Sequence, residues 1–398
     1  MKLRLGVSGL AGLFACGILL FCATPSRASA QWIVTNLHPP GATESSALAV
    51  LEGRQAGFAV VGNRLHASTW NGLGAIWLDL HPSGPTDSVV TALAADRQVG
   101  HATVNARFHA CLWNGSTQSW VDLHPTGSLT SAAYGASESQ QVGFTSGADP
   151  HASLWTGSAS SWVDLHPLGA ANSIAYGVSG GRQVGRAWVG GITRASLWSG
   201  TRASWLDLNP AGSTYSIAYG ISGSRQVGFA RFAGADHAGL WSGSAASWVD
   251  LSPVGSQISR AWGVSGEWQV GQAIVDGIGR ASLWNNSAAS WTDLHAALPP
   301  EFLDSTARAV WSDGSVIKVV GYGFNFLTNR AEALLWTGVV PPWCAADFNQ
   351  DGGVDGTDVF VFFGAWSDGD AAADVNQDGG IDGPDVEYFI VRWEQGGC

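Results

Sequence analysis

The sequence predicts an all-β, seven-bladed β-propeller that is closed by its own N-terminal strand and followed by a small α-helical module. Three observations support this fold class. Short motifs recur seven times, mostly at steps of 42 or 43 residues. The 398-residue chain holds 53 Gly and 21 Trp but one Met, a composition typical of short strands and tight turns around large flat side chains. Near the C-terminus this composition gives way to an acidic segment.

The first 30 residues are set apart from the repeats. Lys2 and Arg4 precede an apolar run over residues 5–23, and residues 28–30 form a small-x-small cleavage site. We predict a signal peptide over residues 1–30, cleaved after Ala30, and therefore an extracellular or cell-surface location with no membrane span in the mature chain. Because the apolar run is long for a signal peptide, an uncleaved membrane anchor is the alternative.

Three anchors mark the seven copies of the repeat. The Trp of an LW element stands at Trp70, Trp113, Trp155, Trp198, Trp241, Trp284 and Trp336. A VG-like element ends at Gly57, Gly100, Gly143, Gly185, Gly228, Gly271 and Gly321. A DL element places its Leu at Leu37, Leu80, Leu123, Leu165, Leu208, Leu251 and Leu294. Repeats of about 40–45 residues with several strands each are typical of propellers.

Each copy contains four strand-like segments. In the fourth complete copy they span 173–179, 183–188, 194–198 and 204–208, and turn-forming residues separate them. Each segment alternates apolar and polar residues, as a strand with two different faces requires. Four strands make one propeller blade.

The two ends of the array predict ring closure. The chain enters at residues 32–37, which match the fourth strand of a copy, and the last copy stops after its third strand at 333–336. The N-terminal strand would then complete the last blade of a propeller spanning residues 31–340, and closure would remove exposed sheet edges. A solenoid with capped ends is the alternative.

The repeat pattern H-A-x-L-W, followed by D-L and then a V-G strand, resembles the HAF-type extracellular repeat over about residues 32–338. The resemblance implies secretion and a repeat fold. It brings no catalytic residues with it.

Polar residues also recur at fixed positions. Histidine stands at His38, His81, His124, His166 and His295, and at a second position at His66, His109, His151 and His237. Glutamine recurs from Gln55 to Gln269, and aspartate recurs before the DL leucine from Asp79 to Asp293. A metal site needs donors that converge on one point, whereas these residues are spread one per blade. We therefore predict that they brace strands and loops, and we predict no catalytic residue.

One repeat position varies in a way that suggests ligand binding. Nine residues before the VG glycine the copies have Leu48, Thr91, Tyr134, Tyr176, Tyr219 and Trp262, with Trp311 one residue off register in the last copy. We predict Tyr134, Tyr176, Tyr219, Trp262 and Trp311 as candidate ligand-binding residues, because an arc of aromatic rings at a channel mouth suits stacking on sugars. Packing between blades is the alternative.

Charge is concentrated at the C-terminal end. The formal net charge is −12, and residues 343–398 hold 12 acidic side chains and one basic side chain. A weakly acidic propeller with an intensely acidic module argues against nucleic acid, because phosphate binding needs a basic face. The acidic module indicates a bound cation instead.

Two twelve-residue loops in this module match the calcium-binding pattern of oxygen donors with Gly at position 6. The predicted ligands of two Ca²⁺ ions are Asp347, Asn349, Asp351, Gly353, Asp355 and Asp358 in the first loop, and Asp374, Asn376, Asp378, Gly380, Asp382 and Asp385 in the second. Position 12 is Asp rather than Glu, and a helix is expected only after each loop, over 357–366 and 384–393.

These features make residues 343–398 resemble a type I dockerin. The resemblance implies a non-catalytic calcium-folded module that attaches to a cohesin-like or cell-surface protein. Ser/Thr pairs typically occupy loop positions 10 and 11 in dockerins, but this chain has Gly356 and Thr357 in one loop and Gly383 and Pro384 in the other. The chain therefore departs from the dockerin pattern at these two positions of both loops.

Cys344 and Cys398 bracket the acidic module. In an oxidising compartment a disulfide between them would close it end to end, and two unpaired cysteines are the alternative. Cys111 replaces a repeated Ser, so a small buried thiol is expected there.

Together these observations predict a secreted or cell-surface, non-enzymatic binding or scaffold protein. The alternative is a carbohydrate-active enzyme, a polysaccharide hydrolase or lyase with a propeller catalytic domain. A glycosidase needs two carboxyl groups in unequal environments across a cleft. Glu267 and Asp313 depart from the repeat, but the sequence does not place them together.

Overall fold

We describe a computed structural model over residues 32–72, 76–339, 345–349, 353–376 and 380–394. The chain forms two compact units, one of residues 30–341 and one that includes residues 342–398. Within the described residues, no helix combines the length and apolarity that a membrane span requires. The predicted signal peptide and the predicted pair of Cys344 and Cys398 lie outside these residues.

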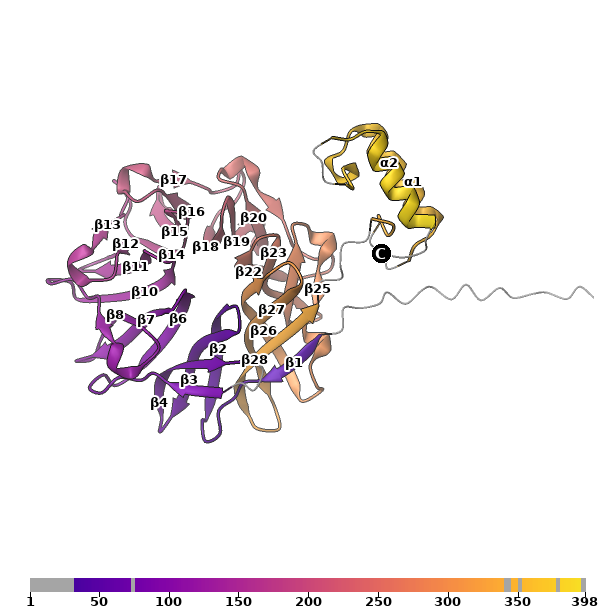
Figure 1. Cartoon of the computed structure of the whole chain (residues 1–398). Coiled ribbons are helices and arrows are strands. Elements are labelled where there is room, and N and C mark those ends of the chain that lie inside the picture. The colour runs from indigo at the N-terminus through magenta and orange to yellow at the C-terminus, as the bar shows by residue number, and fades with distance from the viewer. Residues whose placement is uncertain (1–31, 73–75, 340–344, 350–352, 377–379, 395–398) are drawn as a thin grey trace, which may run out of the picture. The chain divides into compact units, whose positions relative to one another are not determined.

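The first unit consists of seven four-stranded antiparallel sheets arranged around a central axis (Figure 1). Blades 1 to 3 are β2 (Glu44–Leu51), β3 (Arg54–Val61), β4 (Arg64–Asn71) and β5 (Ile76–Asp79); β6 (Ser88–Ala94), β7 (Arg97–Val104), β8 (Arg107–Trp113) and β9 (Val121–Asp122); and β10 (Thr130–Ala136), β11 (Gln141–Ser146), β12 (Pro150–Trp155) and β13 (Val163–Asp164). Blades 4 and 5 are β14 (Ser173–Ser179), β15 (Arg182–Val189), β16 (Ile192–Trp198) and β17 (Leu206–Asp207); and β18 (Ser216–Ser222), β19 (Arg225–Phe232), β20 (Ala235–Trp241) and β21 (Val249–Asp250). Blade 6 is β22 (Ile258–Ser265), β23 (Trp268–Val275), β24 (Ile278–Asn285) and β25 (Thr292–Asp293), and blade 7 is β26 (Phe302–Ser312), β27 (Val316–Asn325), β28 (Arg330–Val339) and β1 (Ile33–Asn36). The predicted seven-bladed propeller is confirmed.

The fourth strand of blade 4 is shorter than the sequence suggested. Residues 202–204 form a single 3-10 turn, and only Leu206–Asp207 pairs with β16. The Ser204 hydroxyl fixes this turn, because it accepts a hydrogen bond from the Ser199 N–H (2.8 Å) and donates one to the Thr201 carbonyl (2.6 Å). Serine side chains that bond to nearby backbone compete with strand pairing.

The core lies between neighbouring blades rather than within one sheet. All seven repeated tryptophans are fully buried. Trp198 of blade 4, for example, packs against Leu154 and Leu165 of blade 3. The repeated glycine lets the first two strands of a blade approach closely: a Cβ on Gly185 would lie 1.9 Å from the Ile174 carbonyl oxygen of the paired strand. Each blade therefore covers the apolar face of its neighbour around the ring.

The N-terminal strand closes this ring, as predicted. β1 pairs antiparallel with β28, with Val34 opposite Trp336, and the Leu37 N–H donates to the Ala333 carbonyl (2.8 Å). Figure 1 shows β1 beside β28 at the junction of the first and last blades. No sheet of the ring is left short of its fourth strand, so closure joins the two ends of the array.

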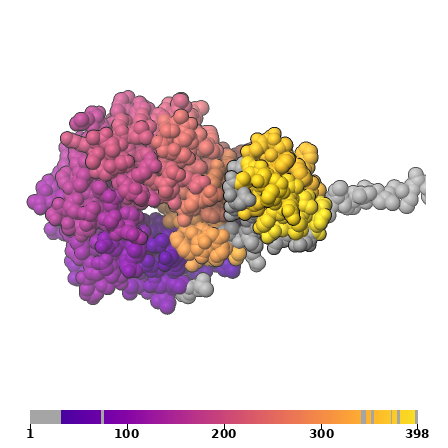
Figure 2. Space-filling view, turned by 45° about the horizontal axis from the view of Figure 1, so that its top comes forward, coloured from indigo at the N-terminus to yellow at the C-terminus, as the bar shows by residue number. Residues whose placement is uncertain are grey.

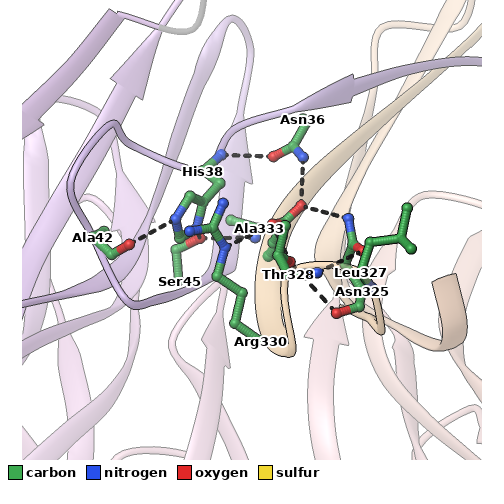
Figure 3. Close-up of polar contacts among 10 residues, drawn as sticks. Asn36, His38, Ala42, Ser45, Asn325, Leu327, Thr328, Arg330 and Ala333 are labelled. Carbon is green, nitrogen blue, oxygen red and sulfur yellow. Dashed lines mark hydrogen bonds and ion pairs between the residues drawn. The ribbon is translucent and has the colours of Figure 1, made fainter. Parts of the chain in front are cut away.

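The closing blade uses different charges from the other six. In those blades an Asp of the fourth strand pairs with a His or Arg of the third, as Asp207 does with Arg194 at 2.8 Å. In blade 7 the third strand carries Glu332 and the fourth carries Asn36, whose amide donates to the Glu332 carboxylate (2.7 Å). Figure 3 shows Asn36 among the polar contacts that join the first and last blades. Blade 7 therefore has a Glu–Asn pair where the other blades have a His–Asp or an Arg–Asp pair.

The second unit contains two helices, α1 (Gly356–Asp368) and α2 (Gly383–Glu394), and each follows one of the acidic loops as predicted. Their buried rings Phe362 and Phe389 stack 4.1 Å apart. Each helix also bonds to the opposite loop: Trp366 Nε1 donates to the Asp382 carbonyl (3.2 Å) and Trp393 Nε1 donates to the Asp355 carbonyl (2.8 Å). The two halves thus hold each other through matching contacts.

Candidate functional site

The repeated histidines brace the blades, as the sequence suggested. His124 hydrogen-bonds through Nδ1 to the Ser131 hydroxyl (2.8 Å) and through Nε2 to the Ser128 carbonyl (3.0 Å). Its ring stacks at 3.9 Å on His109, which in turn bonds to Asp122 (2.8 Å). Stacked pairs of the same kind occur at His66 with His81 and at His151 with His166. These rings form separate struts and do not converge on a metal.

Because of these stacked histidine pairs, we expect the propeller to lose stability in mild acid. Burial, and then the neighbouring His151, lower the pKa of His166 below its ordinary value. A histidine with a lowered folded pKa contributes stability above its unfolded pKa of about 6.5, and this stability is lost as pH falls through the folded pKa. Asn209 fills the equivalent position in the next blade without a titratable group. We expect His166→Asn to flatten the fall of the melting temperature between neutral pH and about pH 5. An unchanged pH profile would contradict this.

The carboxylates that break the repeat do not form a catalytic pair. Glu267 binds Arg225 of the neighbouring blade (2.8 Å). Asp313 accepts hydrogen bonds from Ser315 and Val316 within its own turn, and these lower its pKa to about 2. Both are thus engaged separately in exposed hairpins, and the lowered pKa of Asp313 is the opposite of what a general acid needs.

The variable position lines the central channel. The first strand of every blade contacts the first strands of both neighbouring blades. Each of these strands contains a β-bulge, and the bulged residues are Leu48, Thr91, Tyr134, Tyr176, Tyr219, Trp262 and Arg308. The bulges of neighbouring blades lie close together, since a Cβ on Gly177 would be 2.8 Å from the Tyr219 carbonyl oxygen. The seven side chains therefore form one ring around the channel, and Figure 2 shows the propeller hollowed at its centre.

Four of the five predicted aromatic residues belong to this ring. The rings of Tyr134 and Tyr176 lie 5.5 Å apart and those of Tyr176 and Tyr219 lie 5.0 Å apart, so the three tyrosines form a continuous row. Trp262 continues it in the next blade. The tyrosines and Trp262 are half-buried. They pack on one another and still present part of their surface to the channel.

Trp311 is not part of the ring, and this position in the prediction was wrong. Trp311 pairs with Lys318 and packs in the cluster around Trp70, near the junction of blades 7 and 1. Arg308 takes the ring position instead. The first hairpin of blade 7 is longer than in the other blades, so counting back from the VG glycine misplaces the bulge. The bulged residue is instead the one that directly follows the Ala or Val before each bulge, which is Ala307 in blade 7.

Arginines accompany the aromatic rings. Arg186 donates from Nε to the Tyr176 hydroxyl (3.3 Å) and from a terminal nitrogen to the Asn172 side chain (3.1 Å). The guanidinium of Arg308 lies 4.8 Å from the centre of the Trp262 ring, a cation–π distance. Burial lowers the pKa of Arg308, and Tyr322 and Tyr219 act against this. We call Tyr134, Tyr176, Tyr219, Trp262, Arg186 and Arg308 the tyrosine–arginine surface.

The phenols of this surface are hydrogen-bond donors at neutral pH. Burial raises the pKa of Tyr134 and of Tyr219 to about 12. Burial also raises the pKa of Tyr176, although the charge of Arg186 works in the opposite direction. Protonated hydroxyls beside aromatic faces and guanidinium groups can bind hydroxylated, ring-shaped ligands.

The predicted calcium ligands fall into two matching sets. Asp358 and Asp385, at position 12 of each loop, are fully buried at the start of their helices. Asp358 accepts the backbone N–H groups of Asn349 (3.0 Å) and Asp355 (2.9 Å), and Asp385 accepts those of Asn376 (3.2 Å) and Asp382 (3.0 Å). Asp347, Gly353, Asp374 and Gly380 are also described, whereas Asp351 and Asp378 lie outside the described residues. In the part of the chain that is described, no three His, Cys, Asp or Glu side chains gather into a metal site.

Comparison of the chain with protein-family models and with curated proteins gives no match. Among solved structures it resembles an oligogalacturonate lyase in complex with manganese (TM-score 0.50, 10% identity, covering 79% of this chain and 95% of that one). It also resembles TolB from Acinetobacter baumannii (TM-score 0.45, 13% identity, 64% of each chain) and a puromycin hydrolase (TM-score 0.49, 9% identity, 77% of this chain and 57% of that one). The chain thus spans less than two thirds of TolB and of the hydrolase.

These comparisons contradict the predicted non-enzymatic binding or scaffold protein. An oligogalacturonate lyase is among the proteins with this fold, and nothing in the comparisons supports a scaffold displayed through a dockerin. We therefore withdraw that prediction. At 10% identity the similarity to the lyase shows the fold alone, and the fold found here is the seven-bladed β-propeller.

Proposed function

We propose that this protein is a carbohydrate-active enzyme whose propeller binds a sugar chain at the tyrosine–arginine surface. The observation that carries the proposal is the row of half-buried rings Tyr134, Tyr176, Tyr219 and Trp262 along one side of the channel. Aromatic faces stack on the apolar faces of sugar rings, and phenol hydroxyls donate to sugar oxygens. An oligogalacturonate lyase shares the fold, so the fold is compatible with such a substrate.

A substitution of the row tests this proposal. We expect Tyr176→Ala to weaken binding of a sugar oligomer by roughly tenfold, because one stacked aromatic ring is worth about 1–1.5 kcal/mol. Binding by calorimetry and release of shorter sugars would be scored separately on the full chain, against a panel of plant and algal polysaccharides. Trp188→Ala is the matched control, because Trp188 lies in the same blade with 44% of its surface exposed. Equal binding by wild type and Tyr176→Ala would refute the proposal.

We further propose that the C-terminal unit folds around two Ca²⁺ ions in an exported protein. Carboxylate and amide oxygens are the donors that Ca²⁺ prefers, and the described members of the two sets are held by matching contacts. Asp347, Asn349 and Asp358 would hold one ion, with Asp374, Asn376 and Asp385 around the other. The signal peptide that the sequence predicts over residues 1–30 is the reason for proposing export. A cohesin-like or cell-surface protein partner stays a prediction of the sequence.

Removal of calcium should unfold this unit and leave the propeller intact. A ligand that binds only the folded state at one hundred times its Kd stabilises that state by about 2.7 kcal/mol. We expect a calorimetric scan to show a low-temperature transition that moves up with added Ca²⁺ and is lost in a chelator. Asp358→Asn should abolish the shift, whereas Asp368→Asn, on an exposed residue at the end of α1, should retain it. Identical scans with and without chelator would contradict the calcium proposal.

A further inference from the structure

Arg308 is a charged residue in a ring of uncharged ones. The other six bulged residues around the channel are neutral: Leu48, Thr91, Tyr134, Tyr176, Tyr219 and Trp262. Arg308 makes no ion pair and no side-chain hydrogen bond with any described residue, and its contact is the face of Trp262. A desolvated cation without a partner is costly to the fold. The cost is offset when a ligand supplies the missing anion.

Half of the described propeller arginines have a carboxylate partner, and Arg308 is not among them. Ion pairs join Arg54 to Asp96, Arg194 to Asp207, Arg225 to Glu267, Arg280 to Asp293 and Arg330 to Glu332. Arg186, which bonds to Tyr176 in the middle of the tyrosine row, also lacks a carboxylate, because both of its partners are neutral. Two guanidinium groups of the tyrosine–arginine surface thus keep their capacity to bind an anion.

Asp236, an acidic residue of blade 5, is already paired with arginines. Asp236 is almost fully buried and binds both Arg231 (2.6 Å) and Arg260 (2.5 Å), so this trio keeps a net positive charge. Arg260 and Arg308 both act on the titration of Tyr219, which places them near its phenol. These arginines create a local positive field, although the formal net charge of the chain is −12, and such a field favours the binding of anions at this surface.

One cation lies beside the middle of the aromatic row and another lies at its end. Arg186 donates a hydrogen bond to Tyr176, and the rings of Tyr176 and Tyr219 are 5.0 Å apart. Arg308 belongs to the second blade beyond Tyr219, and its guanidinium lies over the ring of Trp262 in the blade between them. A chain of sugars with a carboxylate on successive units presents the complementary order. Guanidinium groups bind carboxylates through two parallel hydrogen bonds, a geometry that a neutral sugar cannot use.

We infer that the ligand of the tyrosine–arginine surface is an acidic oligosaccharide of the uronate class, whose carboxylates bind to Arg308 and Arg186. This inference rests on the proposed function and names its substrate class. Stacking on the tyrosines provides affinity for sugars in general. The two arginines provide the preference for the charged form.

The test compares three probes on the full-length protein: an oligogalacturonate, its methyl ester and a neutral galactose oligomer of the same length. Charge-assisted hydrogen bonds predict that wild type binds the free acid roughly tenfold or more tightly than the ester, and that added salt reduces this preference. Arg308→Gln should bring the acid and the ester to within about threefold of each other while leaving affinity for the neutral oligomer unchanged. Arg308→Lys, which keeps the charge without the fork, should retain part of the preference. Arg202→Gln, on an exposed turn, should behave as wild type.

The outcomes separate the two proposals. If wild type binds acid, ester and neutral oligomers equally and Tyr176→Ala weakens all three, the proposed function holds and the uronate inference is overturned. A preference for the acid that survives Arg308→Gln, in a variant that melts like wild type, also overturns it. If none of the three probes binds, both proposals fail. Loss of the acid preference in Arg308→Gln alone, with Arg202→Gln unaffected, supports the inference.

Discussion

Replacing Trp198 by alanine is expected to lower the free energy of unfolding of the propeller by about 3–5 kcal/mol. Trp198 is fully buried and fills the layer between blades 3 and 4, where it contacts Leu154, Leu165 and Ala175. Its indole N–H has no hydrogen-bond partner among the described residues, so the loss comes from packing and from the cavity left behind rather than from a broken polar contact. No smaller residue of the layer can move in to fill the space, because the flanking backbones are fixed by sheet pairing.

Urea unfolding followed by tryptophan fluorescence and by circular dichroism would measure this effect. Trp188→Ala is the control, since Trp188 belongs to the same blade but is 44% exposed, and it should cost less than about 1 kcal/mol. Trp155→Ala should reproduce the large loss, because Trp155 is its fully buried counterpart in blade 3. A loss below about 1 kcal/mol at Trp198 would show that the inter-blade layers are not the main source of stability.

The repeats allowed the frame of this molecule to be predicted because each repeated residue has the same task in every blade. Three residues therefore recur at a fixed spacing in the sequence: a buried Trp, a Gly that lies close to a carbonyl of the paired strand, and an Asp that binds the third strand. Ring closure was also predictable, since the fragment at residues 32–37 is the strand that the last copy lacks. The His struts followed from the same reasoning about residues spread one per blade.

The candidate site was only partly predictable because it is built from positions where the copies differ. Tyr134, Tyr176, Tyr219 and Trp262 kept the common spacing and were found. Arg308 was missed because the longer hairpin of blade 7 shifts the count, and Arg186 was missed because it lies on a second strand and reaches the ring only through its side chain. Function was less accessible still, because ligand chemistry depends on side chains that converge from several blades.

The charges of the closing blade were also outside the reach of the repeat pattern, and they predict the second large effect. Asn36→Asp should destabilise the propeller by roughly 2–4 kcal/mol at neutral pH. The substitution replaces the amide that donates to Glu332 (2.7 Å) with a second carboxylate. Glu332 is 2% exposed and is held by Arg330, Thr328 and Asn325 besides Asn36, so it cannot turn away to water.

The effect should depend on pH in a defined direction. Burial by itself would raise the pKa of Glu332, but the hydrogen bonds from Arg330 and Asn36 and from its other partners hold it below its ordinary value. In wild type this contribution is therefore present above the unfolded pKa of about 4.3 and is lost as pH falls through the lower folded pKa. In Asn36→Asp the repulsion should weaken as the introduced carboxyl takes up a proton, so the gap between variant and wild type should narrow in acid.

A charge exchange separates repulsion from simple loss of a bond. The double variant Asn36→Asp with Glu332→His recreates the pair found at Asp79 and His66, and it should recover a measurable part of the stability lost in Asn36→Asp alone. Asn36→Ala, which removes the amide without adding charge, should cost less than Asn36→Asp. Equal losses in Asn36→Ala and Asn36→Asp, with no recovery in the double variant, would contradict an electrostatic basis. Recovery in the double variant would show that the charges at this position help β1 to pair with β28. Asn36 and Glu332 match each other, whereas each is a poorer match for the Asp and the His or Arg found in the other blades.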